Sequence, residues 1–443
     1  MAYSSNLKWI LVWGALFTVF ATRTNGIDIF MDWNVSFSNS LSPLSIDQQA
    51  CFYQSQLHFA KAFFLHFGLS PQDKIMNGIQ QRLNSWQDGV SGTNCPIKPS
   101  TNWTYVFQIK DQIGSFSYFP SINFQKASGG YGPIRVNNRN VIAVPFLKPE
   151  AKFDLLIGDW YAGDYKYFRT LLGTEVSAYD VTPDAILMNG NGPYGHSMST
   201  PYESFTVEKG MQRGKDRRNK VGLSALCVSS GKTYRFRISN VGKTLSFNFR
   251  IQNHTMLLVE TEGSYTNQIS LNSLDVHVGQ SYSVLVTADQ NDADFYMVAS
   301  PKLLDTSIIG VYTLYQFPIQ SVNSEAAYGI SVVTGNHRGF GSGDWAPDSR
   351  NTYNVIDPIV RSTAQVYPGG WTAEYAFLDN PGMWNLRSQN LKNWYLGQEL
   401  YIRVYDADPN PAKERPPPDN LLLCGIFYQS NAPAPAPGPL TGF

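Results

Sequence analysis

Strict alternation of apolar and polar residues is the feature that most limits how this chain can fold. In residues 245–252 every second side chain is apolar, and the same period of two recurs in residues 105–109, 233–239 and 400–404. Successive side chains of a strand point to opposite faces, so each segment predicts a strand with one face on a core and one in water. Glycine and asparagine mark turns between them. The pattern predicts an all-β protein of antiparallel sandwiches.

The composition provides enough apolar residues for several packed cores, and its balanced charge argues against nucleic acid or an anionic membrane as a partner. Hydrophobic residues make up 43% of the 443 residues and charged residues 15%, which is too little charge for a disordered chain. At ~150 residues per domain, the length allows about three domains. Lysine plus arginine equals aspartate plus glutamate at 34 each. A chain without net charge has no global field to draw it onto nucleic acid or an anionic membrane.

The first 26 residues have the composition of a secretory signal. Lys8 ends a short polar region, residues 9–20 are mostly apolar, and small or polar residues follow. The apolar run is shorter than the ~20 residues needed to span a bilayer, so a cleaved signal is predicted rather than an anchor. The tail, residues 431–443, alternates alanine and proline and shows no hydrophobic segment for a lipid anchor. The chain is therefore expected to be secreted, without a membrane anchor.

Three N-x-S/T sequons follow the signal, at Asn34, Asn102 and Asn253. In a secreted chain such sequons predict N-glycosylation, and therefore surface positions.

Two segments break the strand pattern. Residues 50–69 are apolar all round, and a helix there would bring His58 and His66 near one face. Residues 209–230 hold six basic residues and one acid. In a secreted chain this run predicts a solvated loop rather than a nucleic-acid patch.

Several strings in order along the chain carry a family resemblance. They include NSWQDGV at 84–90, IGDWY at 157–161, GKTYRFRISNVG at 231–242 and WNLR at 384–387. With these motifs the chain resembles plant multicopper-oxidase-like proteins, in the monocopper oxidase-like and pollen ascorbate-oxidase-homologue branch. The resemblance covers roughly three quarters of the chain. It implies tandem cupredoxin (plastocyanin-like) Greek-key β-sandwich domains.

The resemblance also implies domain boundaries and one large departure. After the signal at 1–26, we expect cupredoxin-like domains at 27–148 and 149–320, a domain remnant at 321–430 and the Ala/Pro tail at 431–443. Residues 209–230 read as an insertion into the second domain. Only 28 residues, 316–343, stand where the third domain needs a full set of strands, so that domain is expected to be largely truncated. Skipped exons, a retained intron or a faulty gene model would each explain these breaks.

Histidine spacing argues against copper. Multicopper oxidases hold their cluster with four His-x-His pairs, because imidazoles one residue apart on a strand face the same side. No two of the six histidines here have that spacing; they are His58, His66, His196, His254, His277 and His337.

The family positions of these pairs hold other residue types. They read Ile75-Met76-Asn77, aromatic residues near 117–120, and Trp384-Asn385-Leu386, while the remaining pair falls in the missing part of domain three. No cysteine lies in a blue-copper context either. No catalytic residue, no metal ligand and no copper cofactor are therefore predicted. His254 and His277 are expected to make structural hydrogen bonds.

The four cysteines divide into two groups. Cys95 and Cys424 match family positions, and the resemblance implies a disulfide between them. Cys51 and Cys227 fall in the two aberrant segments and are expected to be unpaired or mispaired.

The sequence thus predicts a secreted glycoprotein that resembles multicopper oxidases without their ligands, with a non-catalytic role in the cell wall or apoplast. For this branch the resemblance implies pollen or directional growth, and the expected partner is a wall polysaccharide or a wall protein. The alternatives are a copper-dependent oxidoreductase, ascorbate-oxidase-like as the family name implies, and a non-functional splice or gene-model variant.

Overall fold

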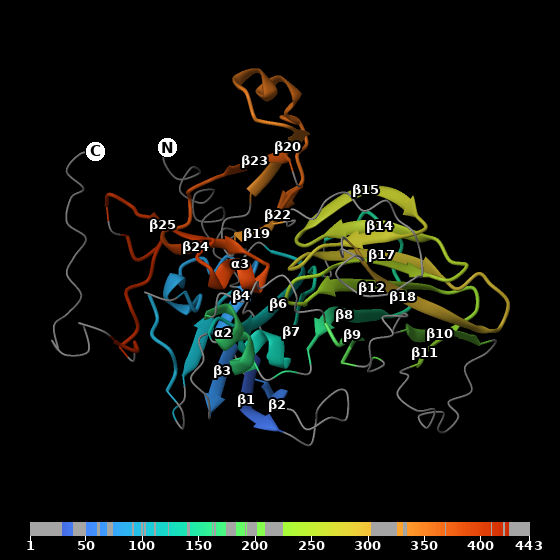
Figure 1. Cartoon of the computed structure of the whole chain (residues 1–443), viewed down its shortest axis with the longest axis horizontal. Coiled ribbons are helices and arrows are strands. Elements are labelled where there is room, and N and C mark those ends of the chain that lie inside the picture. The colour runs from blue at the N-terminus through green and yellow to red at the C-terminus, as the bar shows by residue number, and fades with distance from the viewer. Residues whose placement is uncertain are drawn as a thin grey trace, which may run out of the picture.

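The protein is described by a computed structural model. It describes residues 29–38, 50–59, 63–68, 74–90, 93–98, 101, 103–109, 112–122, 124–139, 142–161, 163, 165–173, 183–190, 192, 202–208, 225–302, 326–330, 335–367, 369–408, 410–419 and 421–424. The described elements are almost all strands, as the alternation predicts, and they group into three successive units (Figure 1). No helix in this described part is long and apolar enough to cross a membrane.

The first unit contains a four-stranded and a three-stranded sheet. The orders are β2-β1-β3-β5 and β4-β6-β7. Two short 3₁₀ helices, η1 and η2, accompany them. The bounds are β1 Ile29–Ser38, β2 Ala50–Phe59, β3 Phe63–Gly68, β4 Lys74–Asn77, η1 Ser85–Gln87, β5 Thr104–Phe107, β6 Gly114–Pro120, η2 Gln125–Ser128 and β7 Gly132–Val136.

The helix considered for residues 50–69 is wrong, because this segment forms β2 and β3. Strand β2 pairs antiparallel with all of β1, and β3 runs parallel to β1 on its other side. His58 and His66 therefore lie on different strands, opposite Phe30 and Asp32. The segment is rich in phenylalanine, and aromatic residues favour strands once a partner strand is available.

The second unit is a sandwich of six and five strands. The orders are β15-β14-β17-β12-β8-β9 and β11-β10-β18-β13-β16. Its core holds the apolar side chains of the predicted strands, including Phe236, Phe247 and Phe249. The bounds are β8 Lys152–Trp160, α2 Tyr165–Gly173, β9 Ala185–Met188, β10 Tyr202–Glu208, β11 Ala225–Ser229, β12 Thr233–Asn240, β13 Ser246–Ile251, β14 Met256–Thr261, β15 Ser264–Leu271, β16 Leu274–Val276, β17 Ser281–Thr287 and β18 Asp294–Lys302.

Two predictions for this unit need correction. The end of the 209–230 segment is not a loop, because β11 runs parallel to β10 there; residues 209–224 lie outside the described residues. The polar face of β12 does not meet water, since Arg235 and Arg237 are only 4% and 2% exposed. Alternation of apolar and polar residues identifies which side chains share a face of the strand, but it does not reveal what covers that face.

The third unit keeps two small sheets, with orders β22-β19-β24-β25 and β21-β20-β23. Its own buried apolar cluster is small and centres on Trp384 and Val404. Strands β20 and β23, with the loop that carries η3 between β20 and β21, project away from the rest of the molecule (Figure 1). The bounds are β19 Ala326–Ile330, β20 Gly335–Ser342, η3 Pro347–Thr352, β21 Val360–Arg361, β22 Thr363–Val366, β23 Gly370–Ala376, β24 Gly382–Ser388, α3 Leu391–Tyr395 and β25 Glu399–Val404.

Candidate functional site

The segments that stand at the family's copper positions meet where the three units join. Strand β4 pairs with β6, which brings Asn77 opposite Ser117. From the third unit, the Gln389 side-chain amide donates to the Asn77 side-chain oxygen at 3.1 Å. The Asn77 amide in turn donates to the carbonyl of Gly279, in the second unit, at 3.4 Å. Asn77 thus links all three units through one buried side chain.

A buried cation lies beside this link. Arg387, at the end of β24, is among the largest fully buried side chains. Its Cζ lies 5.4 Å from the Phe119 ring centroid and 4.8 Å from that of Trp394, and its Nη1 donates to the Asn385 side-chain oxygen at 3.1 Å. Burial lowers the pKa of Arg387 to about 10, a value at which the group still carries its charge at neutral pH.

These donors do not fit a copper cluster. Copper in proteins prefers imidazole, thiolate and thioether ligands, whereas this junction presents side-chain amides, aromatic rings and a guanidinium. A guanidinium has only donors and a positive charge, so it opposes a second cation. Among the described residues no group of three or more His, Cys, Asp or Glu side chains could hold a metal ion.

Of the described histidine side chains, His254 lies within the second unit, whereas His277 lies where the second unit meets the third, with its ring centroid 6.1 Å from that of Tyr367. His254 Nδ1 is 2.7 Å from the Gln252 carbonyl oxygen, and His277 Nδ1 is 2.8 Å from Ser246 Oγ. Both rings are buried in the second unit, with the structural hydrogen bonds that the sequence predicts. His337 is in β20, with its side chain outside the described residues, as are those of His58 and His66, and His196 is wholly outside them.

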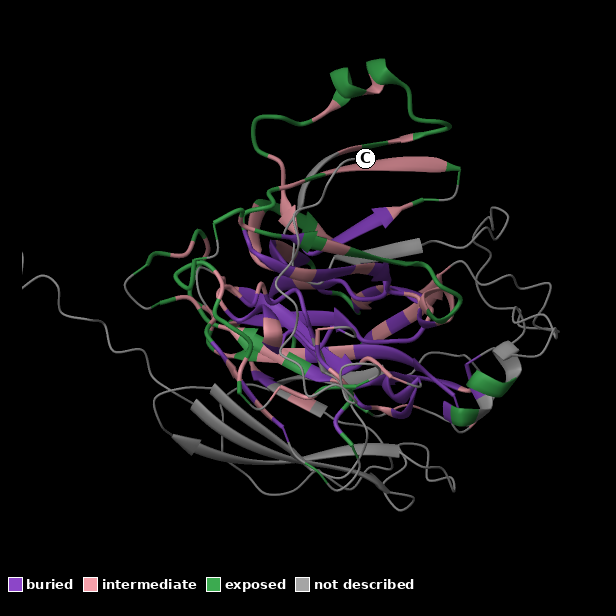
Figure 2. Ribbon diagram, turned by 90° about the vertical axis from the view of Figure 1, so that its left-hand side faces the viewer, coloured by how far each residue is buried: buried purple, intermediate pink, exposed green. Residues whose placement is uncertain are grey.

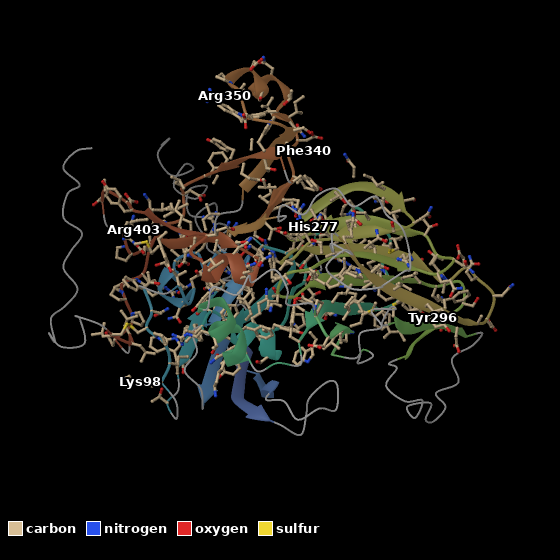
Figure 3. The ribbon with its side chains drawn as sticks, viewed as in Figure 1. Lys98, His277, Tyr296, Phe340, Arg350 and Arg403 are labelled. Atoms are coloured by element: carbon tan, nitrogen blue, oxygen red, sulfur yellow. A yellow bond between two sulfur atoms is a disulfide. The ribbon has the colours of Figure 1, made fainter. Side chains whose placement is uncertain are left out.

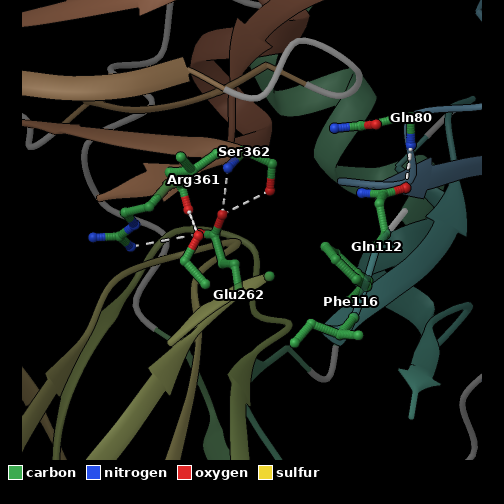
Figure 4. A pocket seen from close by; sticks show the side chains of 10 residues that line it. Gln80, Gln112, Phe116, Glu262, Arg361 and Ser362 are labelled. Atoms are coloured by element: carbon green, nitrogen blue, oxygen red, sulfur yellow. Dashed lines mark hydrogen bonds and ion pairs between the residues drawn. The ribbon is translucent and has the colours of Figure 1, made fainter. Parts of the chain in front are cut away.

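A pocket of about 90 Å³ opens between the three units, lined by Gln80 and Phe116 of the first, Glu262 of the second and Ser362 of the third. Figure 4 shows Glu262 and Ser362 on one side of it and Gln112 with Phe116 on the other. Gln112 accepts from the Gln80 backbone N–H and donates to the Gly78 carbonyl, both at 2.8 Å. A volume of this size has room for about three waters.

Glu262 fastens the second unit to the third at this pocket. Its carboxylate accepts from the backbone N–H and Oγ of Ser362 at 2.5 and 2.7 Å, and from the backbone N–H of Thr363 at 3.1 Å. Arg361 Nη2 lies 3.4 Å away as its ion-pair partner. Because the carboxylate is saturated by these partners, its role here is structural.

A second buried ion-pair group fastens the second unit to the first. Glu260 Oε1 lies 2.6 Å from Arg235 Nη2 and 3.2 Å from Arg237 Nη1. Arg237 Nη1 also donates to Ser115 Oγ on β6 at 2.7 Å. No local pattern in the sequence predicts this group, because Glu260 and Ser115 are 23 and 122 residues from Arg237 and each member resembles an ordinary surface residue.

Two buried lysines complete the junction. Lys126 Nζ lies 4.4 Å from the Phe119 ring centroid, and Lys243 Nζ lies 3.6 Å from those of both Tyr161 and Phe168. Burial lowers the pKa of each lysine to about 7, and the charge of Arg387 lowers that of Lys126 further. Aromatic faces partly replace water around both cations.

The other predicted residues are placed as follows. Cys95 and Cys424 form a disulfide, with their Cα atoms 5.8 Å apart. Asn253 is exposed in the turn between β13 and β14, while Asn34 is in β1 with an undescribed side chain and Asn102 lies outside the described residues. Cys51 and Cys227 are in β2 and β11, and their side chains are likewise undescribed.

Three cupredoxin-like β-units around a shared junction define a class of protein, and family models agree with it. Models described as multicopper oxidase match residues 75–141, 152–317 and 330–410. Solved structures share the fold: a laccase from Botrytis aclada aligns with a TM-score of 0.64 over 85% of this chain and 87% of that one at 17% identity. Fet3p, a multicopper oxidase that functions in iron import, gives the same score over 84% and 90% at 14% identity.

Comparison with curated relatives identifies the family within this class. Monocopper oxidase-like protein SKU5 from Arabidopsis thaliana is 36% identical, over 81% of both chains. An L-ascorbate oxidase homologue from Brassica napus is 31% identical, over 91% of this chain and 93% of the relative. The chain therefore belongs to the plant multicopper-oxidase-like family, with the monocopper oxidase-like proteins and L-ascorbate oxidase homologues. The SKU5 alignment spans 495 positions, more than the 443 residues present, so the relative carries segments that this chain lacks.

Proposed function

We propose that this chain is a secreted, non-catalytic member of its family, acting in the plant cell wall or apoplast in pollen or directional growth. The observation that carries the non-catalytic part is the Asn77–Gln389 hydrogen bond beside Arg387. An oxidase would need copper-binding imidazoles at this junction, whereas here neutral amides bind each other and a guanidinium supplies positive charge. The junction then serves to hold the three units together.

The experiment compares this protein with a copper-loaded laccase, expressed and purified in parallel. After mild chelation we expect no stoichiometric copper and no oxidation of ascorbate or phenols, while the control keeps both. Chelation removes adventitious ions and leaves cluster copper bound. A retained copper-to-protein ratio near one, with blue thiolate-to-copper absorption, would establish the alternative, a copper-dependent oxidoreductase.

Secretion and partner are tested separately. Protein recovered from culture medium should bind wall polysaccharide or a wall protein, in a sedimentation assay with isolated wall material. Protein found only inside cells would contradict the proposal. Transcript sequencing tests the remaining alternative at the three breaks in the family pattern, residues 50–69, 209–230 and 316–343. If no transcript reads run across these breaks, the result supports a non-functional splice or gene-model variant.

A further inference from the structure

The projecting segment carries three aromatic rings side by side. Trp345 Nε1 donates to the Tyr353 hydroxyl at 2.8 Å, and the centroid of the Tyr353 ring lies 6.1 Å from that of Trp371. The first two rings come from the loop that carries η3, and the third comes from β23. Figure 3 shows this segment between Phe340 at its root and Arg350 near its tip. These three rings are called the aromatic row.

Two glycines of β20 make room for the row. Gly341 lies opposite Trp371 in the ladder between β20 and β23, and a Cβ at Gly341 would lie only 2.7 Å from the Trp371 ring. A Cβ at Gly339, two residues earlier, would lie 3.4 Å from the Tyr353 ring. Both rings therefore lie against the backbone of β20. Any side chain at position 341 would push the Trp371 ring away from this backbone.

The row lies on the face of the small sheet that points away from β22. Thr372 Oγ1 donates to the Gln365 carbonyl of β22 at 2.5 Å, so Thr372 points toward that strand. Because successive side chains of a strand point to opposite faces, Trp371 points away from it. Trp345 is 41% exposed, and Tyr353 and Trp371 are half-buried. Figure 2 shows the projecting segment in intermediate and exposed colours, apart from the buried centre.

The rings are held in position by the protein itself. Besides the Trp345–Tyr353 hydrogen bond, Arg350 Cζ lies 5.3 Å from the Trp345 ring, and the Tyr353 backbone N–H donates to the Arg350 carbonyl at 3.2 Å. Side chains fixed in this way lose little conformational freedom when a ligand binds.

A row of such rings matches the chemistry of a sugar chain. Tryptophan and tyrosine combine a large apolar face with a polar group at the edge. A hexose likewise has apolar C–H faces and hydroxyls around its edge, so its face packs on an aromatic ring while its hydroxyls reach polar groups nearby. The 6.1 Å between the Tyr353 and Trp371 centroids is close to the length of one hexose unit.

The charges around the row favour a neutral ligand. Residues 342–359 contain three carboxylates, Asp344, Asp348 and Asp357, and one cation, Arg350, all of them exposed. Like charges brought together across an interface oppose binding, so a polymer of uronic acids is disfavoured. Carboxylates accept hydrogen bonds from the hydroxyls of a neutral sugar.

We propose that the aromatic row of Trp345, Tyr353 and Trp371 binds a neutral polysaccharide chain. The proposal rests on the proposed function only in taking this polysaccharide from the cell wall. It goes further by assigning the binding surface and by excluding acidic polymers. The junction around Asn77 takes no part in it.

Native affinity electrophoresis of the full chain tests the proposal. Gels contain hydroxyethyl cellulose, galactomannan or arabinoxylan as neutral probes, or polygalacturonate as the acidic one. At least one neutral polymer should retard the wild type, and polygalacturonate should not. Trp345→Ala should lower the association constant at least five-fold. Trp345→Phe keeps a ring without the Nε1 hydrogen bond and should lose less.

The matched control is Tyr405→Ala, which removes an exposed aromatic ring beyond the end of β25 and should leave the retardation unchanged. Since Trp345 is in an exposed loop, Trp345→Ala should keep the melting temperature of the wild type. If it does not, Trp345→Phe at the wild-type melting temperature supplies the comparison.

Three results would overturn the proposal. The first is that no neutral polymer retards a protein that still binds isolated wall material, which leaves the proposed function intact. The second is equal retardation of the wild type and both folded Trp345 variants. The third is stronger retardation by polygalacturonate than by every neutral polymer. Retardation that depends on Trp345 supports the surface even in a protein found only inside cells, where the proposed function fails.

Discussion

The Glu262 carboxylate accepts a hydrogen bond from the backbone N–H of Ser362 at 2.5 Å, although 100 residues separate them. Glu262→Gln places an amide donor against these N–H groups and leaves the Arg361 charge without its partner. Removing one partner of a buried pair costs about 3 kcal/mol or more. We expect a loss of that size in the free energy of unfolding, measured by urea denaturation. Asp292→Asn, an exposed neutralisation, should change it by less than about 0.5 kcal/mol.

Buried Lys126 predicts a pH-dependent stability. Its pKa is about 7 in the folded protein, so between pH 7 and 10.5 the unfolded chain binds more protons than the folded one. Stability from this group therefore rises with pH across that window, by roughly 1.4 kcal/mol per pH unit, and stays at its lowest below pH 7. Lys126→Met should be more stable than wild type at acid pH, with a difference that shrinks above pH 7.

Thermal unfolding at a series of pH values measures this difference. Exposed Lys232 supplies the control, because Lys232→Met should show no such trend. If the melting temperatures of wild type and Lys126→Met differ by the same amount from pH 5 to 10, the pKa of Lys126 is not lowered in the folded protein and the prediction is wrong.

The Cys95–Cys424 disulfide should make a large contribution to stability. It closes a loop of 329 residues, for which the chain-entropy model gives on the order of 6 kcal/mol. Cys424→Ser should lose most of that amount, and a reducing agent should destabilise the wild type similarly without affecting the variant. Non-reducing peptide mapping shows the bridge directly; two alkylated free thiols at these positions would refute it.

Glycosylation is tested at Asn253, which is exposed with a φ of +56°. Thr255→Ala removes the sequon without disturbing this left-handed asparagine, whose conformation a longer side chain tolerates less well. The secreted variant should carry one glycan fewer on intact mass measurement. An unchanged glycan mass would show that Asn253 is not modified.

The alternation of apolar and polar residues predicts the strands, but it does not predict which other parts of the chain pack against them. Residues 233–239 and 245–252 are strands because alternation is a property of neighbouring residues. The burial of Arg235 and Arg237 depends on Glu260 and on another unit, which no local pattern records. The helix considered for residues 50–69 is wrong for the same reason, since β2 and β3 within this segment both pair with β1.

The candidate site was predictable in part. The absence of His-x-His pairs could be read from the sequence alone, and the family resemblance indicated which segments stand at their positions. The bond that replaces them joins residues 312 positions apart, so only the folded chain reveals that Asn77 and Gln389 face each other.

The Asn77–Gln389 hydrogen bond has a consequence for metal binding. A histidine introduced at either position would leave the other amide buried without its partner, at a cost of about 1–3 kcal/mol, before any metal could bind. Arg387 would repel the first ion to arrive. A copper site at this junction would therefore require several simultaneous changes, each harmful by itself, so no single substitution is expected to create one.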